Sequence, residues 1–128
     1  MSSPAITVTH TDFVFFHTKD FAAAREFYEQ MLGLPCSTTY GTFPGGEFET
    51  GNLTVVIMEA EAMGLEFSAK GPIALRVDDV AAARAALEAR GVAFTGDIID
   101  SGVCHQAFFA DPDGNALILH HRYAPPPA

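Results

Sequence analysis

The sequence predicts an α+β domain assembled from two similar β-α-β-β-β halves. A helix-opening segment occurs twice, at Lys19–Arg25 and at Asp78–Arg84. A β-rich run precedes each of these segments, and a Gly-Asn pair followed by an apolar strand closes each half. A repeated unit of about 60 residues is too long for a solenoid repeat, so it indicates duplication within one fold.

The first strand of each half is expected over residues 11–18 and 72–77, which are rich in β-branched, aromatic and aliphatic side chains. Asp20 and Asp79 then stand where a side chain can cap the free N–H groups of a first helical turn. We expect helices near Asp20–Leu32 and Asp79–Arg90, each stopped by a glycine and each with an apolar face toward a sheet.

Shorter strands punctuated by glycine follow each helix, and the last strand of each half follows Gly51-Asn52 or Gly114-Asn115. We therefore expect one domain over residues 1–123, divided into module one (about 6–59), a linker (about 60–70) and module two (about 71–123). Residues 124–128, which contain three consecutive prolines, are expected to form a flexible tail.

The composition limits the classes of partner. A chain of 128 residues with 48% hydrophobic and 18% charged residues is typical of one globular core. A net charge of −9 with seven basic residues argues against nucleic acid as a partner. No apolar run approaches the ~20 residues of a membrane span, Met1–Pro4 lacks the features of a secretory signal, and two cysteines are too few for a disulfide framework. We expect a cytoplasmic protein without a membrane partner.

Two stretches carry a family resemblance. One is the sequence of the predicted first helix and its end, Asp20–Leu34, and the other is the turn Phe108–Asn115, which contains Asp-Pro-Asp-Gly-Asn. Together they resemble the vicinal oxygen chelate superfamily, which includes glyoxalase I, bleomycin-resistance proteins, extradiol dioxygenases and fosfomycin-resistance proteins. The resemblance covers about residues 6–122 and implies curved mixed sheets around a shared groove. It also implies a homodimer, for which exposed strand edges give a physical reason.

The same resemblance implies four metal-ligand positions, two in each module. In this chain they fall on Phe13, Val55, Pro72 and Ile118, none of which offers a lone pair to a metal. We therefore expect no metal and no other cofactor at the usual site, and the metal-assisted chemistries of the superfamily are in doubt.

Strand side chains alternate between the two faces of a sheet, which gives an expected set of groove residues. Its apolar members suit an aromatic or aliphatic ligand, and His17, Arg76 and His120 could orient an anionic or hydrogen-bonding group at the rim. The complete expected set is Phe13, Phe15, His17, Val55, Ile57, Arg76, Cys104, Phe108, Ile118 and His120.

Two other chemistries use residues of this set. Cys104 and His105 are adjacent, but neighbours on a strand point to opposite faces and cannot easily form a nucleophilic pair. A non-standard metal set of His17 and His120 with Cys104 or Glu49 has competent donors, but no recognised spacing supports it. The catalytic residues, if any, are unknown.

Three functions remain open from the sequence. The first is a metal-free, small-molecule-binding protein of the bleomycin-resistance type. The second is a metal-dependent lyase or dioxygenase with a non-standard ligand set. The third is a protein-interaction module without a small ligand. Metal analysis separates the first two, and a small-molecule binding screen separates both from the third.

Overall fold

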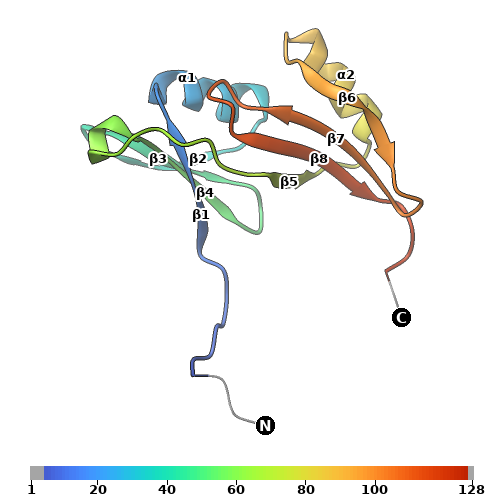
Figure 1. Ribbon diagram of the computed structural model, residues 1–128, viewed down its shortest axis with the longest axis horizontal. Coiled ribbons are helices and arrows are strands. Elements are labelled where there is room, and N and C mark those ends of the chain that lie inside the picture. Colours follow the sequence, from blue (N-terminus) through green and yellow to red (C-terminus); the bar gives the residue numbers. More distant parts are fainter. Residues whose placement is uncertain (1–4, 127–128) are drawn as a thin grey trace.

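The structure is a computed structural model that describes residues 5–126 (Figure 1). The expectations about Met1–Pro4 and about the last two residues of the tail lie outside the described residues. Within the range, residues 124 and 125 contact the domain: the Ala124 N–H donates to the carbonyl of Val103, and Arg122 Nη2 donates to the carbonyl of Pro125. No helix of residues 5–126 is long and apolar enough to cross a membrane.

Two four-stranded sheets with the same internal order form the frame of the molecule (Figure 1). The first sheet has the order β1-β4-β3-β2 and the second β5-β8-β7-β6. In each, the first and last strands of the module run parallel, and the remaining pairs are antiparallel. This repeated topology confirms the two β-α-β-β-β modules. The strands are β1 (Phe13–Thr18), β2 (Cys36–Tyr40), β3 (Phe43–Glu49), β4 (Thr54–Glu59), β5 (Ile73–Arg76), β6 (Phe94–Asp100), β7 (Cys104–Ala110) and β8 (Ala116–Arg122).

Both helices begin at the predicted aspartates. The Asp20 carboxylate accepts the N–H of Ala23 ahead of α1 (Phe21–Arg25), and the Asp79 carboxylate accepts the N–H of Ala82 ahead of α2 (Val80–Ala89). The first helix then widens into a π-helix, η1 (Glu26–Met31), which the apolar spacing does not reveal. A short 3₁₀ turn, η2 (Glu61–Met63), lies in the linker.

The hydrophobic core lies between the helices and the faces of the sheets that they cover. Phe16, Val55 and Ile57 of the first sheet and Leu117 and Leu119 of the second belong to one continuous cluster. Both helices lie along the upper margin of Figure 1. Each sheet therefore keeps one face free of helix, and these two faces are called the open faces.

The Asp-Pro-Asp-Gly-Asn turn between β7 and β8 joins the modules. Buried Asp111 accepts hydrogen bonds from the Tyr28 hydroxyl at 2.6 Å and from the Asn115 amide at 2.8 Å. The same amide donates to the carbonyl of His17, and the Thr18 hydroxyl donates to Asp113 at 2.6 Å. Burial, and then the Asp111 carboxylate, raise the pKa of the Tyr28 hydroxyl, which keeps it a donor. The turn is thus an anchor between the modules as well as a change of direction.

Candidate ligand-binding site

The open face of the first sheet is defined by the pairing of β1 with β4. Phe13, Phe15 and His17 pair with Thr54, Val56 and Met58. Paired residues of neighbouring strands share a face, so these six side chains lie away from the helices. The predicted parity of Phe13, Phe15 and His17 on one face is the parity that the structure shows.

Val55 and Ile57 lie on the other face, and the predicted register of β4 is corrected for both. They pair with Val14 and Phe16, are 2% and 0% exposed, and belong to the core. The reason is a length difference: the segment between Gly51 and the start of β4 is one residue longer than the segment between Gly114 and the start of β8. Aligning the two Gly-Asn pairs therefore shifts β4 by one residue and exchanges its faces.

A hollow of about 210 Å³, here the first hollow, lies on the open face of the first sheet. Its walls are aromatic and aliphatic apart from Thr54 and two carboxylates, Asp12 and Glu47. Gly45 lets two of its lining side chains pack closely, because a Cβ there would stand 2.9 Å from Met58 Cγ and 3.1 Å from the Tyr40 ring. The hollow is lined by Asp12, Phe13, Phe15, Tyr40, Glu47, Thr54, Val56 and Met58.

Tyr40 and Glu47 form the polar pair of the first hollow. The Tyr40 hydroxyl donates to Glu47 Oε2 at 2.7 Å. Desolvation and this carboxylate raise the pKa of Tyr40 to about 12, so the hydroxyl stays protonated. Sequence reasoning missed both residues, because the register of the β2–β3 hairpin, which includes two irregularities, decides which of its side chains reach this face.

His17 lies on the same open face but is covered by the linker. Only 6% of its surface is exposed. The Ser68 N–H donates to its Nδ1 at 3.2 Å, and its ring packs edge-on against Phe15 and tilted against Phe67. Desolvation, and secondarily Lys70, lower the pKa of the imidazole. His17 is therefore a neutral acceptor beneath the linker and does not line the first hollow.

Replacement of His17 by Asn is expected to flatten the dependence of Tm on pH. The pKa of His17 lies below 6.5 in the folded protein, so the unfolded chain takes up a proton first as the pH falls. The free energy of unfolding of the wild type therefore falls as pH drops below about 6.5, whereas Asn can accept the Ser68 N–H without titrating. Thermal unfolding between about pH 7.5 and 5.5 measures this, and parallel profiles for both proteins would contradict it.

The open face of the second sheet carries the other predicted site residues. Ala74 and Arg76 pair with Ile118 and His120, and across β8 the latter two pair with Phe108 and Gln106. A second hollow of about 360 Å³ is lined by Arg76, His120, Arg122, Ala124 and Pro126. It shares no lining residue with the first hollow. The structure thus brings Arg76 and His120 together but places His17 in the other sheet.

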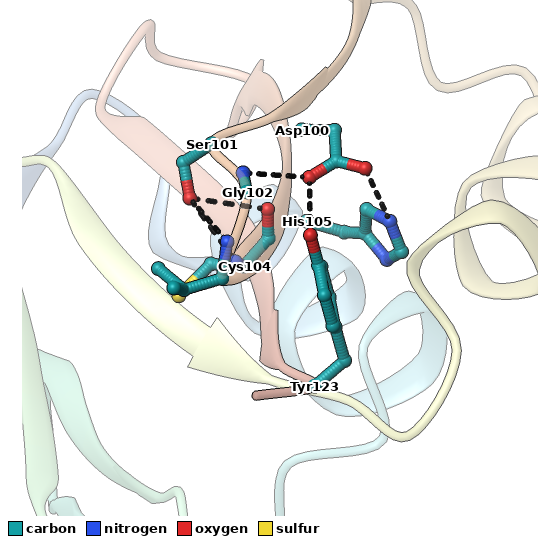
Figure 2. A network of polar contacts seen from close by, with 7 residues as sticks. Asp100, Ser101, Gly102, Cys104, His105 and Tyr123 are labelled. Atoms are coloured by element: carbon teal, nitrogen blue, oxygen red, sulfur yellow. Dashed lines mark hydrogen bonds and ion pairs between the residues drawn. The ribbon is translucent and has the colours of Figure 1, made fainter. Parts of the chain in front are cut away.

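Cys104 and His105 engage different groups (Figure 2). Cys104 is 8% exposed and pairs with Arg122, and its N–H donates to the Ser101 hydroxyl at 3.0 Å. His105 points to the other face, where Nε2 lies 3.3 Å from Asp100 Oδ2 and the ring packs against Tyr123. This agrees with strand alternation and leaves no thiol–imidazole pair.

Asp100 organises the end of the second module in Figure 2. It accepts the N–H of Gly102 at 2.8 Å and the hydroxyl of Tyr123 at 2.7 Å. These two hydrogen bonds, with a smaller contribution from His105, hold the pKa of Asp100 below its ordinary value. The network fastens the β6–β7 turn to the residue that follows β8, so it positions the C-terminal segment beside the second hollow.

The four positions at which the family resemblance implies metal ligands carry apolar side chains. Phe13, Pro72 and Ile118 remain at three of them, and the corrected register puts Val56 at the fourth, so none supplies a donor atom. Residues 5–126 also contain no group of three or more His, Cys, Asp or Glu side chains placed to hold an ion. The alternative set built on His17 and His120 is not assembled in that range, and Glu49 accepts from Ser37 and Thr54 instead.

Comparison with known proteins decides the family. A model of the Glyoxalase/Bleomycin resistance protein/Dioxygenase superfamily matches residues 8–119. The chain belongs to this superfamily. The comparison with curated protein sequences gives no match.

Several solved structures share this fold. TnmS3, described as an antibiotic binding protein from Streptomyces sp. CB03234, is 26% identical, with a TM-score of 0.75 over 91% of this chain and 98% of its own. A superfamily member from Sphaerobacter thermophilus is 21% identical, with a TM-score of 0.76 over 88% and 97%. A putative glyoxalase family protein from Bacillus anthracis is 17% identical, with a TM-score of 0.77 over 93% and 99%.

Proposed function

We propose that this protein is a metal-free small-molecule-binding member of the superfamily, and that the first hollow receives the ligand. The observation that carries the proposal is the lining of this hollow, where Phe13, Phe15, Val56 and Met58 surround one carboxylate–phenol pair. Such a surface binds an aromatic or aliphatic body by burying apolar area and uses few polar groups for orientation. The likeness to TnmS3, an antibiotic binding protein, supports this type of function.

The charges of the first hollow favour a neutral or cationic ligand. Asp12 and Glu47 are its only charged lining residues among those described, and both are acidic. Phenylalanine and tyrosine rings also attract cations through their faces. This proposal differs from the expected anionic ligand oriented by His17, Arg76 and His120, because those three side chains do not line this hollow.

We propose that a second copy of the chain packs over the first hollow. Its volume of about 210 Å³ lies below the range of about 300–1,000 Å³ that is usual for ligand pockets, so a drug-sized ligand would protrude from it. Phe13, which lines the hollow, is 55% exposed. The proposal therefore includes a homodimer, which sedimentation tests.

We also propose a cytoplasmic location. The free thiols of Cys36 and Cys104 support it, because thiols stay reduced in that compartment.

Calorimetric titration with two three-ring probes tests the proposal. Proflavine is a planar aromatic cation, and 1-aminoanthracene is a neutral ring system of similar shape. Both are expected to bind, with proflavine the tighter. Glu47→Gln retains an acceptor for Tyr40 but removes one of the two carboxylates of the hollow, so it should reduce the preference for proflavine and spare the neutral probe. Absence of binding by both probes to the wild type would overturn the proposal.

Metal analysis separates the proposal from a metal-dependent enzyme. Protein purified without chelator is expected to contain well under one transition-metal ion per chain, because the superfamily ligand positions lack donor atoms. Elemental analysis by mass spectrometry measures the content. Near-stoichiometric iron, zinc, nickel or manganese that is lost on replacing His17 or His120 by Ala would favour the enzyme.

A further inference from the structure

We propose that the second hollow is a separate anion-binding site, which takes the carboxylate or phosphate group of a small molecule. It goes beyond the proposed function, since it lies on the other sheet and requires a ligand of the opposite charge. The site consists of Arg76, His120 and Arg122, with Ala124 and Pro126 as apolar walls.

The strand register gathers the three basic side chains on one face. Arg76 of β5 pairs with His120 of the neighbouring strand β8. Arg122 follows two residues later on β8, so it shares the face of His120. Two of the seven Lys and Arg residues of a chain with net charge −9 thus line one hollow, which contains no acidic lining residue among those described. Nearby charges act more strongly than distant, salt-screened ones, so the local positive charge governs binding here.

The two guanidinium groups are not neutralised by a carboxylate in the described part of the chain. Among residues 5–126, neither Arg76 nor Arg122 forms an ion pair, in contrast to Arg25 and Arg84 on the helices. Arg122 Nη2 donates to the carbonyl of Pro125, whereas its buried Nε has no hydrogen-bond partner in the described part of the chain. A buried donor without a partner is unfavourable, so the protein leaves part of the donor capacity of the Arg122 guanidinium group unused.

The size and shape of the hollow set the ligand class. Guanidinium groups offer paired donors that match the oxygens of a carboxylate or a phosphate. The volume of about 360 Å³ falls within the range of small-molecule pockets. The walls formed by Ala124 and Pro126 suit an apolar body such as a single ring. The ligand is therefore a small organic anion rather than a free inorganic ion.

Calorimetric titration at low ionic strength with phenyl phosphate, benzoate and neutral benzyl alcohol tests the inference. At least one of the two anionic probes, phenyl phosphate or benzoate, should bind at least about tenfold more tightly than benzyl alcohol. Added salt should weaken the binding of that anionic probe. The tighter of the two identifies the group as phosphate or carboxylate. Equal affinities for the anionic and neutral probes would overturn the inference.

Arg76→Gln is the decisive variant, because Arg76 is exposed and its loss leaves the core intact. It should weaken binding of the anionic probe about tenfold. Arg25→Gln on α1 removes the same charge outside the second hollow and should leave that affinity unchanged. An equal effect of both variants would attribute the affinity to net charge and overturn the site. The affinity of Arg76→Gln for proflavine should equal that of the wild type. The two proposals can therefore fail independently, because each is measured with its own probe.

Discussion

Asp111→Ala is expected to lower the free energy of unfolding by about 3–4 kcal/mol, since it removes one acceptor from several donors at once. The buried carboxylate accepts from the Tyr28 hydroxyl, from the Asn115 side chain and from the N–H groups of Asp113 and Asn115. Tyr28 and Asn115 are 1% and 0% exposed, so water cannot replace the lost acceptor without opening the structure.

Urea unfolding followed by far-ultraviolet circular dichroism measures the effect, as the chain has no tryptophan. Tyr28→Phe removes one hydrogen bond and should cost about 1–2 kcal/mol. Asp97→Ala, at an exposed position of β6, is the matched control and should stay within about 0.5 kcal/mol of the wild type. If Asp111→Ala and Asp97→Ala had similar stabilities, the turn would not be the anchor between the modules.

Phe15→Ala is expected to weaken proflavine binding about tenfold to a hundredfold, which corresponds to about 1.4–2.8 kcal/mol. Phe15 is half-buried and lines the first hollow, so the variant removes the apolar contact between its ring and the ligand. Rings in the centre of a binding surface commonly contribute effects of this size. The result rests on the proposed ligand site in the first hollow.

Phe108→Ala is the matched control for this variant. Phe108 is also half-buried on an open face, but it pairs with Ile118 in the second sheet. It should leave the affinity for proflavine within about twofold of the wild type if the first hollow alone binds the ligand. Equal losses in Phe15→Ala and Phe108→Ala would show instead that both open faces enclose one ligand, as the sequence-based groove implied.

The sequence by itself determined the features that depend on neighbouring residues. Asp20 and Asp79 predict where the helices begin, because a cap needs only the first turn of its own helix. Alternation along β1 predicts that Phe13 and Phe15 share a face, and the repeated segments predict the two modules. The resemblance to the superfamily also rests on two local sequence stretches, Asp20–Leu34 and Phe108–Asn115.

Only the tertiary structure decided which residues of different segments meet. One extra residue before β4 places Val56, and not Val55, on the open face. The linker covers His17, although alternation alone leaves it at the rim. Arg122 enters the site because the C-terminal segment folds beside it. Strand register depends on loop lengths, and the burial of a side chain under a distant segment depends on contacts between residues far apart in the chain. A local sequence pattern does not encode either of them.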